Sequence, residues 1–448
     1  MDNYDVIIRK GRVVLKETVV TADVAIKNGL IEKIHSSITG TADSEVDAQG
    51  LYVFPGGIDV HAHFSEPGRE HWEGFETGSA MMAAGGMTTY FDMPLNGIPS
   101  TVTVEALKEK AETGRRKSMA DFGLWGGLVP GNEEELEALA AEGVVGFKAF
   151  MSPTGNKEFE RSDDHTLFNG MQKIAPTGKL LALHSESAVI VKGMEQQYSK
   201  HSDAVSFSRS RPEEAEVEAV NRAISYAKVT KCPLHFVHIS TAEAVERIQE
   251  ARLAGVDVTL ETCPHYLFFT EDTLVEKGAA AKCAPPLRSN AQKQKLIQAL
   301  LDGKIDMVSS DHSPCPADMK DTEDMFAAWG GISGGQYTFL AVLELAAAHG
   351  IDLPRTAQWL SGAPAERFGL SGSKGEIKEG KDADLVLVDM NKSFTVTKEN
   401  MYMKNKHSVY EGMTFSASIE QTLLRGGTIF SAAGKPVKRT GRWTQPQQ

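Results

Sequence analysis

The 448-residue sequence contains only four cysteines, and none of them stands in a closely spaced pair. Four widely spread thiols make neither a disulfide framework nor a zinc knuckle, and they indicate a reducing compartment. No apolar run approaches the roughly 18 residues that a membrane helix needs. The first residues carry scattered charges without an apolar core, so we expect no signal peptide and a cytoplasmic location.

An excess of basic residues is also lacking. The 60 acidic side chains outnumber the 47 basic ones and give a formal net charge of −13. Nucleic acids and anionic membranes both attract basic patches, so this balance argues against either as a partner. Beyond that, an acidic surface indicates little more than solubility.

The two ends of the chain share one style of sequence, in which apolar and polar residues alternate between glycine-containing turns. Examples are YDVIIRKGRVV near the start and GEIKEGKDADLVLVD near the end. Alternation of this kind predicts short strands. We expect residues 1–52 and 366–448 to form one small β-sandwich domain, with a disordered tail after Arg439.

The middle of the chain, residues 53–365, instead alternates short apolar runs with longer amphipathic stretches. This order is typical of repeated βα units with a parallel sheet, and eight such runs predict an α/β fold, the (β/α)8 TIM-type barrel. Pro212 marks the start of one helix, and Ser240 with Glu243 forms a possible capping box for another. The predicted strands are Val53–Asp59, Thr88–Met93, Asp121–Leu128, Val144–Phe150, Leu180–His184, Leu234–His238, Val256–Glu261 and Met307–Asp311.

Polar side chains stand where these predicted strands end, which is the catalytic face of such a barrel. The first strand leads into His61 and His63, whose spacing aims both imidazoles to one side so that they can share an ion. The fifth and sixth strands end at His184 and His238, and the eighth ends at Asp311. Each residue taken alone could simply be a core histidine or a helix cap. For all of them to have such a structural role, however, the same explanation would have to apply independently several times at one face of the barrel. We therefore predict a site for divalent ions such as zinc.

Lys148 lies inside the apolar fourth run, VVGFKAF. An unpaired buried ammonium is costly, so this lysine is paired, has a lowered pKa or is chemically modified. The simpler alternative is an amine that reaches the rim of the barrel. The residues alone leave these alternatives open.

Together, the strings PGGIDVHAHF, GFKAF, VHIS and SDHSP resemble those of the cyclic amidohydrolases, a group within the amidohydrolase superfamily. The resemblance covers nearly the whole chain and implies homo-oligomers, often homotetramers. It implies two divalent ions per chain, with zinc expected first and cobalt, nickel or manganese as alternatives. It also implies that carbon dioxide carboxylates Lys148 into a bridge between the ions, and that Asp311 carries the proton during attack by hydroxide. The implied ligands are His61, His63, Lys148, His184, His238 and Asp311.

The residues beside these ligands narrow the expected substrate. Ser65 stands where dihydroorotases carry an arginine that holds a carboxylate, and Pro153 stands where hydantoinases and dihydropyrimidinases carry a tyrosine. The strings SEPGREHWEGFETGS, ETCPHY, KCAPPLR and AWGGISGGQ are instead similar to the branch of the family that opens the hydantoin ring of allantoin. We expect allantoin as the substrate, with contacts near Ser65, Cys283 and Gly331. A broader hydantoinase is the alternative, and a non-catalytic scaffold without metals is a remote one.

Overall fold

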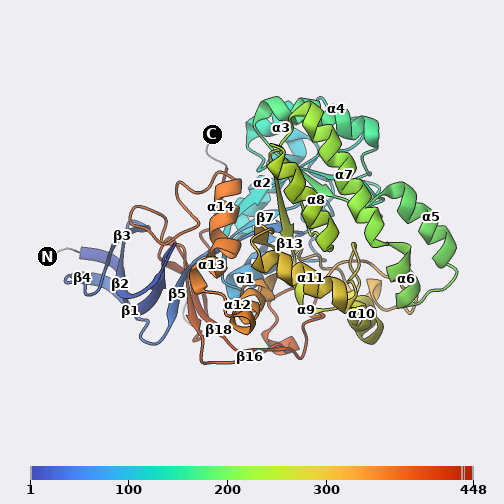
Figure 1. The fold of residues 1–448 in the computed structure, drawn as a ribbon. Helices are drawn as coiled ribbons and strands as arrows, with labels where there is room; N and C mark the ends of the chain where they lie inside the picture. The colour runs from blue at the N-terminus through green and yellow to red at the C-terminus, as the bar shows by residue number, and fades with distance from the viewer. Residues whose placement is uncertain (1–2, 435–436, 438, 446–448) are drawn as a thin grey trace.

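The computed structural model describes residues 3–434, 437 and 439–445. Its centre is a barrel of parallel strands with helices on the outside (Figure 1). A parallel bridge between Ala62 and His312 brings the end of the last barrel strand beside the first. The barrel strands are β6 (Gly57–Ala62), β7 (Met87–Asp92), β8 (Asp121–Leu124) continued by β9 (Gly126–Gly127), β10 (Phe147–Phe150), β11 (Leu181–His184), β12 (Leu234–Phe236), β13 (Val258–Thr262) and β14 (Met307–Val308).

Helices follow the barrel strands along the chain and pack their apolar sides against the barrel, as expected for repeated βα units. They are α1 (Phe75–Ala84), α2 (Val104–Lys117), α3 (Leu136–Glu142), α4 (Asp164–Ile174), α5 (Ala188–Tyr198), α6 (Ala204–Ser210), α7 (Glu213–Thr230), α8 (Ala242–Leu253), α9 (Pro264–Phe268), α10 (Glu271–Lys277), α11 (Asn290–Leu301), α12 (Thr338–His349), α13 (Leu353–Ala357) and α14 (Ala363–Arg367).

Two helix starts compare directly with the sequence prediction. Helix α7 begins immediately after Pro212, as predicted. The capping box predicted for α8 is wrong, because Thr241 is the residue that accepts the hydrogen bond from a backbone N–H of the first turn. Ser240 instead donates its hydroxyl to Glu216, a buried carboxylate of α7. Ser240 therefore ties two neighbouring βα units together.

A second sheet, which has eight strands, lies beside the barrel and is built from both ends of the chain (Figure 1). Its strands follow the order β19-β18-β15-β5-β1-β2-β3, and β4 pairs with β1. This is the small β-sandwich domain expected from the alternating ends. The strands are β1 (Asn3–Val14), β2 (Val19–Lys27), β3 (Leu30–His35), β4 (Thr41–Asp47), β5 (Tyr52–Pro55), β15 (Leu385–Asp389), β18 (Ser418–Leu424) and β19 (Gly427–Ser431), with the short pair β16 (Phe394–Thr395) and β17 (Thr414–Phe415) nearby in the chain.

The first predicted barrel strand, Val53–Asp59, combines two strands that belong to different sheets. β5 pairs with β1 and β15 in the eight-stranded sheet, whereas β6 begins the barrel at Gly57. Between them, a Cβ on Gly56 would lie 2.1 Å from Thr88 Oγ1, so the crossing needs a residue without a side chain. Both pieces are apolar, and for this reason hydropathy did not separate them.

The predicted disorder after Arg439 is wrong for the residues that the structure describes there. Phe122 N–H donates to Arg442 O, and Thr444 N–H donates to Phe122 O, so this segment runs beside β8. The Arg115 guanidinium lies 5.0 Å from the Trp443 ring centroid and adds a cation–π contact. Residues 446–448 lie outside the described residues.

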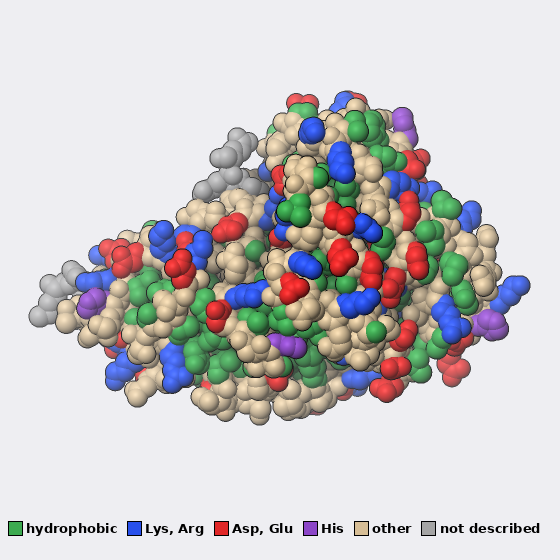
Figure 2. Space-filling view, in the orientation of Figure 1, with side chains coloured by type: hydrophobic (Ala, Val, Ile, Leu, Met, Phe, Trp, Pro, Cys, Tyr) green, Lys and Arg blue, Asp and Glu red, His purple; other side chains and the backbone are tan. Residues whose placement is uncertain are grey.

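The helical face in Figure 2 carries acidic and basic side chains interspersed with one another, without separate fields of either sign on that face. This agrees with a surface that is acidic in sum. Among the residues described, no helix combines the length and the apolar character needed to cross a membrane.

Candidate active site

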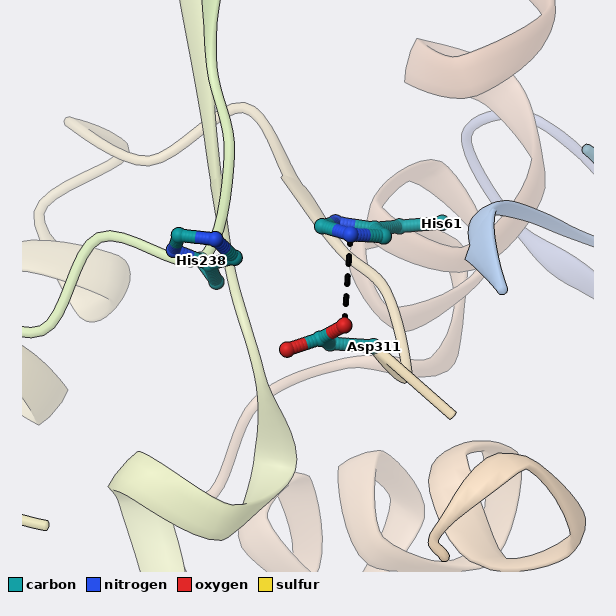
Figure 3. Close-up of side chains that lie close together, drawn as sticks. All are labelled: His61, His238 and Asp311. Carbon is teal, nitrogen blue, oxygen red and sulfur yellow. Dashed lines mark ion pairs between the residues drawn. The ribbon is translucent and has the colours of Figure 1, made fainter. Parts of the chain in front are cut away.

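Two histidines and an aspartate converge at the carboxyl ends of the first and last barrel strands. Asp311 Oδ1 lies 3.2 Å from His61 Nε2 and 3.3 Å from His63 Nε2. His238, from the end of the sixth strand, faces the same space, and His61, His238 and Asp311 surround it in Figure 3. All four side chains are buried or nearly so. One carboxylate and several imidazoles around one point form a donor set that suits a divalent transition metal.

A second pair of imidazoles meets next to this group. His184 Nδ1, at the end of β11, lies 3.1 Å from His238 Nε2. Burial is the main cause that lowers the pKa of both histidines, and the neighbouring Lys148 lowers each further. Neutral imidazoles offer lone pairs, which is the form in which histidine binds a metal. The two nitrogens are therefore placed to share one cation.

Lys148, in β10, is completely buried, and among the described residues its amine has no hydrogen-bond partner. Burial lowers the pKa of Lys148 to about 7, although the nearby Asp311 and Glu261 carboxylates oppose this change. The amine is thus partly uncharged near neutral pH and electrostatically coupled to the histidine and aspartate cluster. The alternative of an amine at the solvent-exposed rim does not agree with this burial.

Two site residues have an unusual backbone. His238 has φ +41° and Asp311 has φ +44°, which is the left-handed region that non-glycine residues rarely adopt. Such conformations persist only where the surroundings enforce them, and they are concentrated at functional sites. Asp59 helps to enforce the one at Asp311, because its Oδ1 accepts the backbone N–H groups of both His61 and Ser310.

Buried carboxylates orient the histidines from behind. Glu261 Oε1 lies 2.6 Å from His61 Nδ1, and its other oxygen lies 3.1 Å from His235 Nε2. Burial alone would raise the pKa of Glu261, but His61 and His235 outweigh it and lower that pKa to about 2. The Nδ1 atom of His61 is thereby engaged, which leaves Nε2 free to face Asp311.

A comparable support stands behind His184. Glu186 Oε2 lies 2.7 Å from His184 Nε2 and 2.6 Å from a guanidinium nitrogen of Arg211. Burial raises the pKa of Glu186, but Arg211 and the hydrogen bond with His184 outweigh it, and the pKa falls to about 2. Asp59, Glu186 and Glu261 were all missed in the sequence, where an acidic residue near a strand end is equally well explained as a helix cap.

Asp311 itself is held in its ionised form. Burial raises its pKa, but the neighbouring His61, His63 and His238 outweigh burial, and the pKa lies well below the usual range. The carboxylate is therefore available as a proton acceptor or metal ligand at neutral pH.

A cavity opens above the cluster and is lined by two of the three residues predicted to contact the substrate. Cys283 and Gly331 line it, and so does Pro153. Ser65 does not line it: this residue is fully buried, has φ +60° and has no hydrogen-bond partner for its hydroxyl among the described residues. The other lining residues are His61, His63, Leu95, Asn96, Phe150, Thr154, Gly155, His184, Phe207, Arg211, His238, Lys282, Ala284, Asp311, Ser313, Phe326, Ala327, Ala328, Trp329 and Gly330.

A (β/α)8 barrel that gathers histidines, a lysine and an aspartate at the carboxyl ends of its strands has the architecture of an amidohydrolase. The model of the amidohydrolase family matches residues 52–435, and the chain belongs to this family. It is an enzyme that hydrolyses cyclic amides.

Comparison with individual proteins narrows the class further. The chain is 53% identical to an allantoinase of Bacillus velezensis, over 96% of this chain and 95% of the relative. It is 47% identical to an allantoinase of Solibacter usitatus, over 98% of this chain and 97% of the relative. Among solved structures it resembles an L-hydantoinase (dihydropyrimidinase) from Arthrobacter aurescens, with a TM-score of 0.95, 30% identity and coverage of 99% and 100% of the two chains.

Proposed function

We propose that this chain hydrolyses an amide bond in the hydantoin ring of allantoin and so opens the ring to give allantoate. The observation that carries the proposal is the high identity to allantoinases from end to end of the chain. The buried histidines, Lys148 and Asp311 around one cavity provide the chemical means.

The donor set fits two divalent ions, with zinc as the first choice and cobalt, nickel or manganese as alternatives. His61, His63 and Asp311 would hold one ion, and His184 and His238 would hold the other. When bound, the ions would polarise the scissile carbonyl and lower the pKa of the attacking water. The fit rests on nitrogen and oxygen atoms that face one another at about 3 Å.

Lys148 would bind the carbon of carbon dioxide through its uncharged amine. A C–N bond forms as one C=O π pair of carbon dioxide moves onto its oxygen, one N–H proton passes to water, and the neutral amine becomes an anionic carbamate. The lowered pKa of Lys148 and its lack of a hydrogen-bond partner among the described residues support this step. As an anion between two cations, the side chain would no longer be an uncompensated buried group.

Asp311 would move the proton. His61 and His63 face Oδ1, which leaves Oδ2 as the atom that accepts a proton from the attacking water. The same oxygen would then donate this proton to the departing ring nitrogen. Glu261 and Glu186 would keep the imidazoles of His61 and His184 in the required orientation.

A panel of substrates with metal analysis of the same sample tests the proposal. We expect turnover of allantoin to exceed turnover of dihydrouracil, together with two divalent ions per chain. Appreciable activity on dihydrouracil with none on allantoin would favour the hydantoinase alternative, which the structural likeness to a dihydropyrimidinase supports. Less than one ion per chain and no turnover would favour the non-catalytic scaffold.

Assembly and location stay predictions from the sequence. We propose a homotetramer in the cytoplasm, with allantoin as the small-molecule partner and no nucleic acid or membrane partner. Light scattering coupled to gel filtration measures the assembly, and a mass near that of one chain would contradict it.

A further inference from the structure

One buried cation in the active-site cavity takes no part in the cluster described above. Lys282 lines the cavity and is only 6% exposed. Its amine donates one hydrogen bond, to Ala328 O, and lies 4.6 Å from the centre of the Phe207 ring. No carboxylate among the described residues forms an ion pair with it. A buried ammonium without a counter-ion is costly, and two of its three N–H groups are still free.

Trp329, which carries a second unused donor, lines the same cavity. The Trp329 indole Nε1 is buried and has no hydrogen-bond partner among the described residues, although an indole N–H in such a place normally has one. The chain holds these two residues close together, because Lys282 Nζ donates to Ala328 O and the Lys282 carbonyl oxygen accepts the backbone N–H of Gly331. Lysine and tryptophan side chains only donate, so the pair requires an acceptor.

The surroundings also favour an electron-rich group there. Burial, and after it Arg211 and Lys320, lower the pKa of Lys282, while the more weakly acting Asp324 and Glu195 raise it, and the net pKa is about 8. Arg211 and Lys282 both line the cavity, and two cationic side chains there favour an electron-rich group. Arg211 is already bound to Glu186, and Lys320 donates to three main-chain carbonyls, whereas the Lys282 amine has one hydrogen bond and no ion pair in the described part of the chain.

We propose that Lys282 Nζ and the Trp329 indole N–H bind the carbonyl oxygen of the ureido group that allantoin carries at C5 of its ring. This inference rests on the proposed function and extends it to the part of the substrate that does not react. The two donors would make the enzyme prefer 5-ureidohydantoin to hydantoins that lack an acceptor at this position. Recognition of this kind is strong, since a substrate without the oxygen leaves both buried donors unpaired.

Two substitutions test the subsite, with allantoin and unsubstituted hydantoin as paired substrates. Lys282→Met keeps the apolar stem and removes the charge, and Trp329→Phe keeps an aromatic ring and removes the N–H. We expect kcat/KM for allantoin to fall about 10- to 100-fold in the first variant and about fivefold in the second. With hydantoin, kcat/KM should stay within about threefold in both. If hydantoin is not turned over, its inhibition constant against allantoin is measured instead and should show the same constancy.

Lys277→Met is the matched control. Lys277 also donates to main-chain carbonyls, of Val409 and Glu411, but it does not line the cavity. Its variant should leave both substrates unaffected. An equal loss on allantoin and hydantoin in Lys282→Met, or no loss on allantoin, would overturn the subsite while the wild-type enzyme still hydrolyses allantoin. Absence of allantoin hydrolysis in the wild type would overturn the proposed function itself, and the subsite with it.

Discussion

Two lysines, Lys148 and Lys374, are both buried in this chain, and they have opposite surroundings. The amine of Lys148 has no hydrogen-bond partner among the described residues, and burial lowers its pKa. Lys374 lies 2.8 Å from Asp121 Oδ2, 2.5 Å from Asp384 Oδ2 and 3.3 Å from Asp382 Oδ2. Burial lowers the pKa of Lys374 as well, but these carboxylates outweigh it and raise that pKa above its ordinary value.

The difference separates a reactive lysine from a structural one. Lys374 is a fixed ammonium that joins the start of β8 to the segment leading into β15, and Arg425 adds a further ion pair to Asp121. Lys148 lacks such pairing, and an amine that is partly uncharged can act as a nucleophile toward carbon dioxide. Substitution of Lys148 should therefore abolish activity, whereas substitution of Lys374 should lower stability.

Lys148→Ala should give the largest effect on activity. We expect kcat/KM for allantoin to fall more than about 10⁴-fold, because loss of the proposed Lys148 bridge would remove both polarisation of the carbonyl and activation of water. In the metal-free, uncarboxylated protein the substitution should cost little stability, since a buried unpaired amine has been removed. Activity assays, metal analysis and thermal unfolding of the same sample measure this.

Added short carboxylic acids should partly restore the Lys148→Ala variant, because they can occupy the place of the carbamate. Lys392→Ala, at an exposed lysine paired with Glu420, is the control and should behave as wild type. If Lys148→Ala kept two ions and full activity without added acid, the carbamate would be wrong.

Asp311→Asn should have the next largest effect. The amide keeps the size of the side chain but cannot accept a proton at Oδ2, so we expect kcat to fall about 10³-fold. Metal analysis should still find bound ions, since the four histidines and Lys148 are intact. A variant that turns over allantoin at the wild-type rate would refute the role of Asp311.

Several features of the fold and of the candidate site could be predicted from the sequence alone. The barrel, the two-ended β domain and the family were predicted and are confirmed. His61, His63 and Asp311 could be brought together in advance because strand ends share one face, and the structure places each histidine within hydrogen-bond distance of Asp311. Metal binding by these residues stays a prediction.

What the sequence did not reveal are contacts between residues far apart in the chain. Lys374 and Asp121 are separated by 253 positions, and Glu261 and His61 by 200. No periodicity connects such pairs, and each side chain taken alone has an ordinary explanation at the surface or at a helix end. These side chains form buried pairs only in the folded chain, and this burial cannot be read from the sequence.

Lys374→Met tests whether Lys374 stabilises the folded chain. It leaves Asp121 and Asp384 buried with only Arg425 nearby, so we expect the free energy of unfolding to fall by about 3–5 kcal/mol. Turnover per folded molecule should remain within about threefold of wild type, because the cluster lies away from the cavity. Urea unfolding followed by fluorescence measures the free energy of unfolding. An activity assay at urea concentrations below the unfolding transition measures turnover. Lys392→Met, at an exposed ion pair, should lose less than about 1 kcal/mol.

The smallest expected effect is the pH dependence of that stability difference. Because the folded pKa of Lys374 lies above its ordinary value of 10.5, its stabilisation is fully present below that pH and is lost as the pH rises toward the folded pKa. The gap in unfolding free energy between wild type and Lys374→Met should be constant from pH 7 to pH 9. Above about pH 10.5 it should shrink by about 1.4 kcal/mol per pH unit. A gap that already narrows between pH 7 and pH 9 would show that Lys374 is not held as a fixed ammonium, and the contrast with Lys148 would then fail.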